Sequence, residues 1–223
     1  MTSPTNWHVN LISHTHWDRA WYVTFQEYRV RLVQLIDRLL DIMDDQPDFQ
    51  YMLDGQMSVL DDYLEVLPHP KTELQALTHS GRVQVGPWYV LADEYLVSPE
   101  SLIRNLMLGH RIGVDYGGVM KIGYVPDGFG HIAQLPQILN GFGIDNAFFW
   151  RGMGAEGDEL GTEFTWSAPD GSSVTTILMP WGYHTASNIG YGVHWGDFSQ
   201  MEFDMTLAQE KLDIFIAKLT PMT

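Results

Sequence analysis

The segment His8–Met43, HVNLISHTHWDRAWYVTFQEYRVRLVQLIDRLLDIM, sets a pattern that the rest of the chain repeats. It begins with His8–Ser13, a short apolar run that is typical of a strand. Thr24 and Glu27 then have the spacing of a capping box, which marks the beginning of a helix. Apolar residues recur at helical spacing after them, and Pro47 marks the end of this predicted helix. A strand followed by a helix is the repeating unit of α/β folds.

The alternation of predicted strands and helices continues along the chain. Further strands are predicted at Phe49–Leu53, Arg82–Val85, Lys121–Val125 and Ala147–Trp150, with a hairpin at Phe164–Ala168 and Val174–Met179. Helices are predicted at Val59–Leu67, at Thr72–His79, from Ser98-Pro99 onward, at Ile132–Leu139 with Pro136 as an interruption, and at Met205–Lys218. The sequence therefore predicts one α/β domain over residues 1–223, with a mainly parallel sheet in a barrel or an open doubly wound arrangement.

Composition excludes several classes of protein. The chain has 223 residues, 45% of them hydrophobic, so it can bury a sizeable core. Its net charge of −16 argues against a nucleic acid or an anionic membrane as partner. The absence of cysteine excludes disulfides, thiolate catalysis and cysteine zinc sites. No stretch approaches the length of a membrane span, and Met1–Asn10 lacks the pattern of a secretory signal, so we expect a cytoplasmic protein.

The first cluster of candidate functional residues directly follows the first predicted strand. In α/β folds, sites gather at the carboxyl ends of strands. If the extended backbone continues, His14, His16 and Asp18 share one face, since side chains alternate along a strand. Imidazole nitrogen and carboxylate oxygen are both good zinc donors. The alternative is a histidine-rich loop with ordinary hydrogen bonds.

A second cluster, Gly123–His131, also follows a predicted strand. Asp127 stands between proline and glycine, in a turn that can present its carboxylate as a metal ligand, a nucleophile or a base; an ordinary turn aspartate is the alternative. The third cluster is the run Phe148–Arg151, FFWR; a buried charge at Arg151 would need a carboxylate partner, and the alternative is a surface arginine just beyond the strand. Trp21 is the aromatic residue that we expect to pack on a sugar ring, since it lies just past the first cluster.

The three clusters, in this order, resemble glycoside hydrolase family 38, the zinc-dependent retaining α-mannosidases. His14–Tyr22, HTHWDRAWY, is similar to the HTHWDREWY form of the motif in bacterial members, with Ala20 in place of glutamate. The resemblance extends from about His8 to Pro180. It implies a seven-stranded α/β barrel as the N-terminal catalytic domain of a longer, multidomain glycosidase. The helical bundle and β domains that follow in the family are absent from these 223 residues.

The resemblance also implies roles for individual residues. His16, Asp18 and Asp127 would be ligands of one Zn²⁺, and Asp127 would also be the catalytic nucleophile. Substrate-binding roles are implied for Trp21, Phe129, Arg151 and Tyr183. The family's fourth zinc ligand and its general acid/base have no convincing match before Thr223, and His184 and His194 are weak substitutes as ligands. We therefore expect a barrel that is incomplete at its C-terminus, and a fragment that binds zinc weakly and turns over poorly.

The expected activity is removal of terminal α-mannosyl residues through a covalent mannosyl-enzyme on Asp127. The expected partner is an α-mannoside or a mannosyl-containing oligosaccharide, with α-1,2, α-1,3 and α-1,6 linkages, mannosylglycerate and its phosphorylated form all open. Two other classes remain as alternatives: a metal-dependent polysaccharide deacetylase-like hydrolase and a non-catalytic carbohydrate-binding module. A homodimer is neither required nor excluded.

Overall fold

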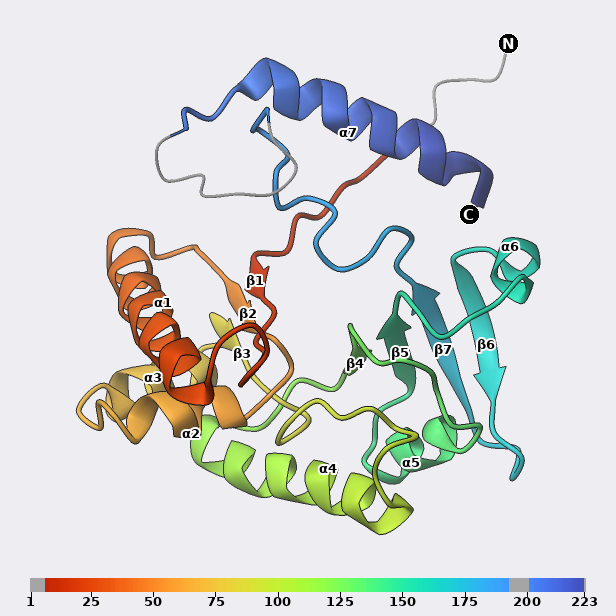
Figure 1. Cartoon of the computed structure of the whole chain (residues 1–223), viewed down its shortest axis with the longest axis horizontal. Helices are drawn as coiled ribbons and strands as arrows, with labels where there is room; N and C mark the ends of the chain where they lie inside the picture. The colour runs from red at the N-terminus through yellow and green to blue at the C-terminus, as the bar shows by residue number, and fades with distance from the viewer. Residues whose placement is uncertain (1–6, 193–200, 223) are drawn as a thin grey trace. The chain divides into compact units, whose positions relative to one another are not determined.

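The computed structural model describes residues 7–192 and 201–222. The chain divides into two compact units, one containing the residues up to Val90 together with Asn105–Met120, the other containing Leu91–Arg104 and the residues from Lys121 onward. Helix α4 (Pro99–Gly113) passes from one unit to the other. Each unit is built around its own sheet (Figure 1).

The first unit contains a three-stranded parallel sheet. Its strands are short and lie in the order β1 (His14–Thr15), β2 (Tyr51–Leu53) and β3 (Val83–Gln84). His14 pairs with Met52, and Tyr51 pairs with Val83. Because all three strands run in the same direction, their carboxyl ends, and the loops after them, meet at one edge of the sheet.

Helices cover this sheet and supply most of its core. They are α1 (Phe25–Asp45), α2 (Ser58–Leu64), α3 (Lys71–His79), the second half of α4 and the 3-10 turn η1 (Val114–Tyr116). The capping box that begins α1 is confirmed, since Glu27 accepts a hydrogen bond from the Thr24 backbone at 2.9 Å and Thr24 caps Glu27 in return. The core side chains are almost fully buried and include Leu32, Ile36, Leu39, Leu53, Leu60 and Tyr63.

The second unit contains a four-stranded mixed sheet in the order β4-β5-β7-β6. Its strands are β4 (Gly123–Val125), β5 (Asn146–Phe149), β6 (Glu163–Ser167) and β7 (Ser173–Leu178). The first three in that order are parallel, and the hairpin partner β6 is antiparallel to β7. The remaining elements are α5 (Leu135–Gly141), α6 (Glu156–Leu160), α7 (Met205–Leu219) and the 3-10 turn η2 (Thr220–Met222).

One sequence expectation is not confirmed, and two need correction. The described residues form sheets of three and four strands, one strand being antiparallel, so a seven-stranded barrel is not confirmed. The predicted strand His8–Ser13 is wrong, because this run is exposed and the first strand begins only at His14. Pro136 does not interrupt a helix but lies in the first turn of α5, where a missing backbone N–H costs nothing.

No helix among the residues that the structure describes is long and apolar enough to cross a membrane.

Candidate functional site

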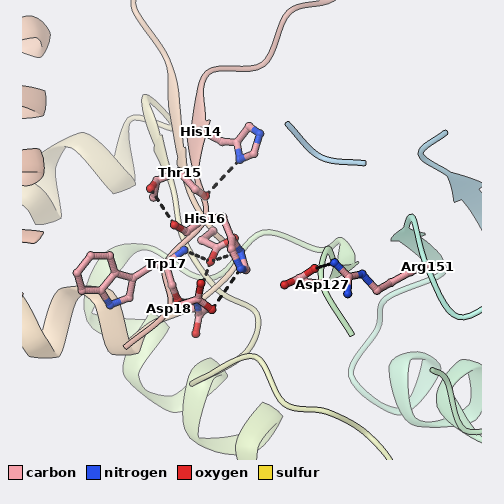
Figure 2. Close-up of polar contacts among 9 residues, drawn as sticks. His14, Thr15, His16, Trp17, Asp18, Asp127 and Arg151 are labelled. Atoms are coloured by element: carbon pink, nitrogen blue, oxygen red, sulfur yellow. Dashed lines mark hydrogen bonds and ion pairs between the residues drawn. The ribbon is translucent and has the colours of Figure 1, made fainter. Parts of the chain in front are cut away.

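His16, the residue directly after β1, lies between two carboxylates. His16 Nε2 is 3.4 Å from Asp18 Oδ1 (Figure 2), and His16 Nδ1 is 3.1 Å from Asp54 Oδ2. Because β1 ends at Thr15, the strict alternation that grouped His14 with these residues stops there; His14 Nδ1 instead lies 3.2 Å from the Thr15 carbonyl oxygen. The structure thus brings His16 and Asp18 together and adds Asp54.

Asp54 is the residue that organises this segment. It is completely buried, directly follows β2 and has a left-handed backbone with φ of 47°. Its Oδ2 accepts hydrogen bonds from the Trp17 backbone N–H at 2.6 Å and from Gln56 Nε2 at 2.8 Å. Gln56 also donates to the Trp17 carbonyl at 3.0 Å. The Asp54 turn therefore fixes both the backbone after β1 and the imidazole of His16.

The sequence predicted a strand at Phe49–Leu53 and assigned no role to Asp54, the residue directly after it. The signal that could have found Asp54 was its position, because it follows β2 as the His16 segment follows β1, and neighbouring parallel strands present their carboxyl ends together.

The electrostatics of His16 suit the binding of a cation. Burial lowers the pKa of His16, but hydrogen bonds with Asp18 and Asp54 outweigh this effect and raise the pKa to about 10. Nε2 and the Asp18 carboxylate are donors that zinc accepts, and a carboxylate on the other ring nitrogen is the usual outer partner of a zinc-bound histidine. These residues fit a pair of zinc ligands. Within residues 7–192 and 201–222 no group of three His, Asp or Glu side chains with metal-site geometry is present.

A second ion pair anchors the loop beyond Asp18. Arg19 donates from Nε and Nη2 to the two carboxylate oxygens of Asp62, each at 2.7 Å. The Asp62 side chain is 5% exposed, and its carboxylate raises the pKa of Arg19. Such a bidentate pair fixes orientation as well as position. Past this anchor Trp21 is 66% exposed and stacks on Tyr22, with ring centroids 3.8 Å apart.

In the second unit, the loop after β4 and the end of β5 form a further cluster. Asp127 Oδ1 is 2.6 Å from Arg151 Nη2 (Figure 2). The Arg151 guanidinium also lies over two aromatic rings, 4.5 Å from the centroid of Phe129 and 4.2 Å from that of Trp150. The carboxylate partner expected for Arg151 is thus Asp127. Phe129 is 70% exposed, so its ring is available to a ligand.

Tyr183 and His184 lie at the edge of this cluster. Tyr183 packs edge-on against Trp150, with ring centroids 6.3 Å apart, and the ring of His184 lies 6.2 Å from the same indole. Arg151 thus contacts both Phe129 and Trp150, and Trp150, which was not among the predicted site residues, connects Arg151 to Tyr183. His194 lies outside the described residues.

A buried acid–histidine pair supports the Asp127 loop from behind. Glu94 Oε1 is 2.8 Å from His131 Nδ1, and Glu94 Oε2 accepts a hydrogen bond from the Ile132 backbone N–H at 2.8 Å. The other ring nitrogen of His131 lies 2.9 Å from the Arg151 carbonyl oxygen. Glu94 was not among the residues predicted from the sequence, and no local motif marks it.

Residues 6–217 match the glycosyl hydrolases family 38 N-terminal domain. The chain belongs to glycosyl hydrolase family 38. The resemblance inferred from the three sequence clusters is therefore confirmed.

Relatives in this family are similar over most of the chain. A protein of Halalkalibacterium halodurans named "Putative mannosylglycerate hydrolase" is 39% identical, with 81% of this chain and 22% of that protein covered. The α-mannosidase of Saccharomyces cerevisiae is 28% identical, with 83% of this chain and 17% of that protein covered. The crystal structure of an α-mannosidase from Enterococcus faecalis V583 matches with a TM-score of 0.79 and 34% identity, over 91% of this chain and 22% of that one. The chain thus spans about a fifth of the length of the relatives that it matches.

Proposed function

We propose that this family 38 chain carries the nucleophile and part of the zinc site of a retaining α-mannosidase. The observation that carries the proposal is the Asp127–Arg151 pair at 2.6 Å, whose guanidinium also lies over the rings of Phe129 and Trp150. A partly exposed carboxylate held by a guanidinium beside aromatic surface suits attack on a sugar whose apolar face packs on those rings. Family membership supports a mannosyl substrate, as the names of the relatives indicate.

The reaction assigned to Asp127 is a double displacement. Its carboxylate forms a bond to the anomeric carbon while the bond from that carbon to the leaving oxygen breaks, and the leaving oxygen takes a proton from an acid that we do not assign to this chain. Water then hydrolyses the mannosyl ester and returns the carboxylate. Arg151 holds Asp127 in one orientation through both steps, and the ring of Phe129 borders the sugar.

Zinc is part of the proposal. His16 and Asp18 are the residues of the first unit that we assign as ligands, and Asp127 is assigned as a third. When bound, zinc would anchor hydroxyl groups of the mannosyl ring and favour charge development in the transition state. Asp54 holds His16 through Nδ1, so that Nε2 is directed to the Asp18 side.

The first test is hydrolysis of an aryl α-mannoside by the product of the complete gene. The assay is run as purified, after removal of metal with a chelator, and after addition of Zn²⁺. Release that the chelator abolishes and zinc restores supports the proposal. Absence of release from folded, zinc-loaded protein would move the assignment to a restricted substrate. Mannosylglycerate is the first of these to assay, given the name of the 39% identical relative.

A second experiment separates this reaction from metal-dependent deacetylation and from simple sugar binding. A fluorinated mannosyl inhibitor traps a glycosyl-enzyme because its second step is slow. Peptide mass spectrometry should then find the mannosyl adduct on Asp127. Sugar binding that survives both removal of metal and loss of the Asp127 carboxylate, without any adduct, would favour a binding module.

A further inference from the structure

The second unit holds a buried, fully bonded acid–histidine pair, Glu94 and His131, that is not among the residues assigned to the reaction. The side chains of Glu94 and His131 are 1% and 5% exposed. His131 packs between Phe149 and Trp166, with ring centroids 4.3 and 5.7 Å away. Both ring nitrogens of His131 and both carboxylate oxygens of Glu94 have partners. A buried polar network satisfied in this way fixes the groups that it joins, since any displacement leaves a desolvated atom unpaired.

The partner of His131 Nε2 determines where protons lie in this network. The Arg151 carbonyl oxygen can only accept, so Nε2 carries a hydrogen and donates it. A second hydrogen is then shared between Nδ1 and Glu94 Oε1, 2.8 Å apart. Glu94 Oε2 simultaneously accepts from the Ile132 N–H. The His131 side chain therefore joins the loop that carries Asp127 to the backbone of Arg151, and Glu94 holds that side chain in place.

Neighbours of Glu94 reinforce the same connection. Asp93 Oδ1 accepts a hydrogen bond from the Phe129 backbone N–H at 2.9 Å. The Tyr95 hydroxyl donates to the His131 carbonyl at 2.8 Å. Residues 93–95 thus hold the loop 127–132 by consecutive side chains, and Glu94 is the only member of the three that reaches the Arg151 backbone through His131.

We propose that Glu94 and His131 are positioning residues for the Asp127–Arg151 pair: they fix the Arg151 backbone so that its guanidinium meets the Asp127 carboxylate. The proposal rests on the proposed function in that the pair is taken to be the nucleophile and its orienting cation. Beyond that function, it states that Glu94 and His131 hold the Asp127–Arg151 pair in place. It also states that the length of the Glu94 side chain, and not its charge, is what matters.

Two substitutions of Glu94 separate reach from charge. Glu94→Gln keeps the length: its amide N–H can donate to His131 Nδ1 while its carbonyl accepts from Ile132, and Nε2–H still donates to Arg151. Glu94→Asp keeps the charge but is one methylene shorter, so it cannot span both partners. We expect Glu94→Asp to lower kcat/KM for the aryl α-mannoside by roughly 10- to 100-fold. The Glu94→Gln protein should keep kcat/KM within about threefold of the parent value.

The matched control is Tyr95→Phe. It removes one hydrogen bond to the same histidine residue from an exposed side chain, a bond that water can replace, so it should lower kcat/KM by much less than Glu94→Asp does. A double-mutant cycle supplies the readout that a general structural role would not move. In an Arg151→Ala background Glu94→Asp should change kcat/KM by less than about twofold, because its effect passes through Arg151. Additive losses would overturn the proposal, as would a Glu94→Gln protein as impaired as Glu94→Asp.

Hydrogen exchange provides a test that does not depend on activity. In the complete gene product, peptides covering residues 127–132 and 150–152 should exchange faster in Glu94→Asp than in the parent or in Glu94→Gln. If the parent hydrolyses no mannoside, the proposed function fails, but faster exchange confined to Glu94→Asp still supports the positioning. Unchanged exchange in Glu94→Asp overturns the positioning whatever the activity.

Discussion

Replacing Asp54 tests how much of the His16 segment depends on one buried carboxylate. Asp54→Ala leaves two buried donors, the Trp17 N–H and the Gln56 amide, without the oxygen that lies 2.6 and 2.8 Å from them. Each unpaired donor lowers the free energy of unfolding by about 1–3 kcal/mol. Alanine at φ of 47° adds roughly 1 kcal/mol. Because removing a buried carboxylate also relieves its desolvation, we place the loss near the lower end of the sum, at about 3 kcal/mol.

Asp54→Asn should separate stability from metal binding. Asparagine tolerates a left-handed backbone, and its carbonyl oxygen can replace Oδ2 as acceptor for Trp17 and Gln56. Its NH₂ group then replaces Asp54 Oδ1, which lies 3.2 Å from His16 Nδ1, and donates a hydrogen bond to that nitrogen. This favours the tautomer of His16 with its hydrogen on Nε2, the nitrogen assigned to zinc. We expect the free energy of unfolding to change by less than about 1 kcal/mol, while zinc affinity falls by roughly 10- to 100-fold.

The assay combines urea unfolding, followed by tryptophan fluorescence, with competition for Zn²⁺ against a chromogenic chelator. The reasoning would be refuted if Asp54→Ala unfolded at the same urea concentration as the parent. It would also be refuted if Asp54→Asn kept the parent's zinc affinity at equal stability, because His16 would then not depend on Asp54 for its orientation.

Three further predictions concern the nucleophile, the exposed tryptophan and a close backbone contact. Asp127→Ala should abolish mannoside turnover, and retention of more than a few per cent of kcat would remove Asp127 from its role. Trp21→Ala should chiefly raise KM, because this exposed ring is assigned to sugar packing and not to bond breaking; a pure loss of kcat would contradict that assignment. Gly109→Ala should lower the free energy of unfolding by about 2 kcal/mol or more, since the added Cβ would meet the Pro87 carbonyl and lie 2.6 Å from the Trp88 carbonyl carbon. Gly141→Ala in α5, with nothing within 4 Å, should be neutral or slightly stabilising in the same urea titration.

Local signals in the sequence were sufficient for most of the helices and for the hairpin. The Thr24–Glu27 box placed the start of α1 correctly because capping depends only on residues three apart. The His8–Ser13 strand was predicted from apolar character alone, and it failed because a strand needs a neighbour: pairing with β2 begins only at His14. Closure into a barrel is a property of sheet pairing far along the chain, which no local pattern encodes.

The residues of the candidate site likewise differ in whether a local sequence pattern identifies them. His16, Asp18 and Asp127 could be named because they occur in recognisable motifs directly after strands. Asp54 and Glu94 could not, although Asp54 has three polar partners and Glu94 two, because the histidines that they hold, His16 and His131, lie 37–38 residues away. Their roles depend on which strand ends and loops meet, and that is settled by packing and not by spacing.

The separation in sequence between His16 and Asp54 has a consequence for how the segment is formed. A peptide containing residues 8–22 alone holds both His16 and Asp18 but neither the buried turn nor the Arg19 anchor on Asp62. The geometry of the pair therefore exists only once β1 and β2 have paired and α2 has packed. If His16 binds zinc as proposed, its affinity for the metal would report the assembled first unit, and a core substitution as distant as Leu32→Ala should weaken it in proportion to the fraction of molecules unfolded.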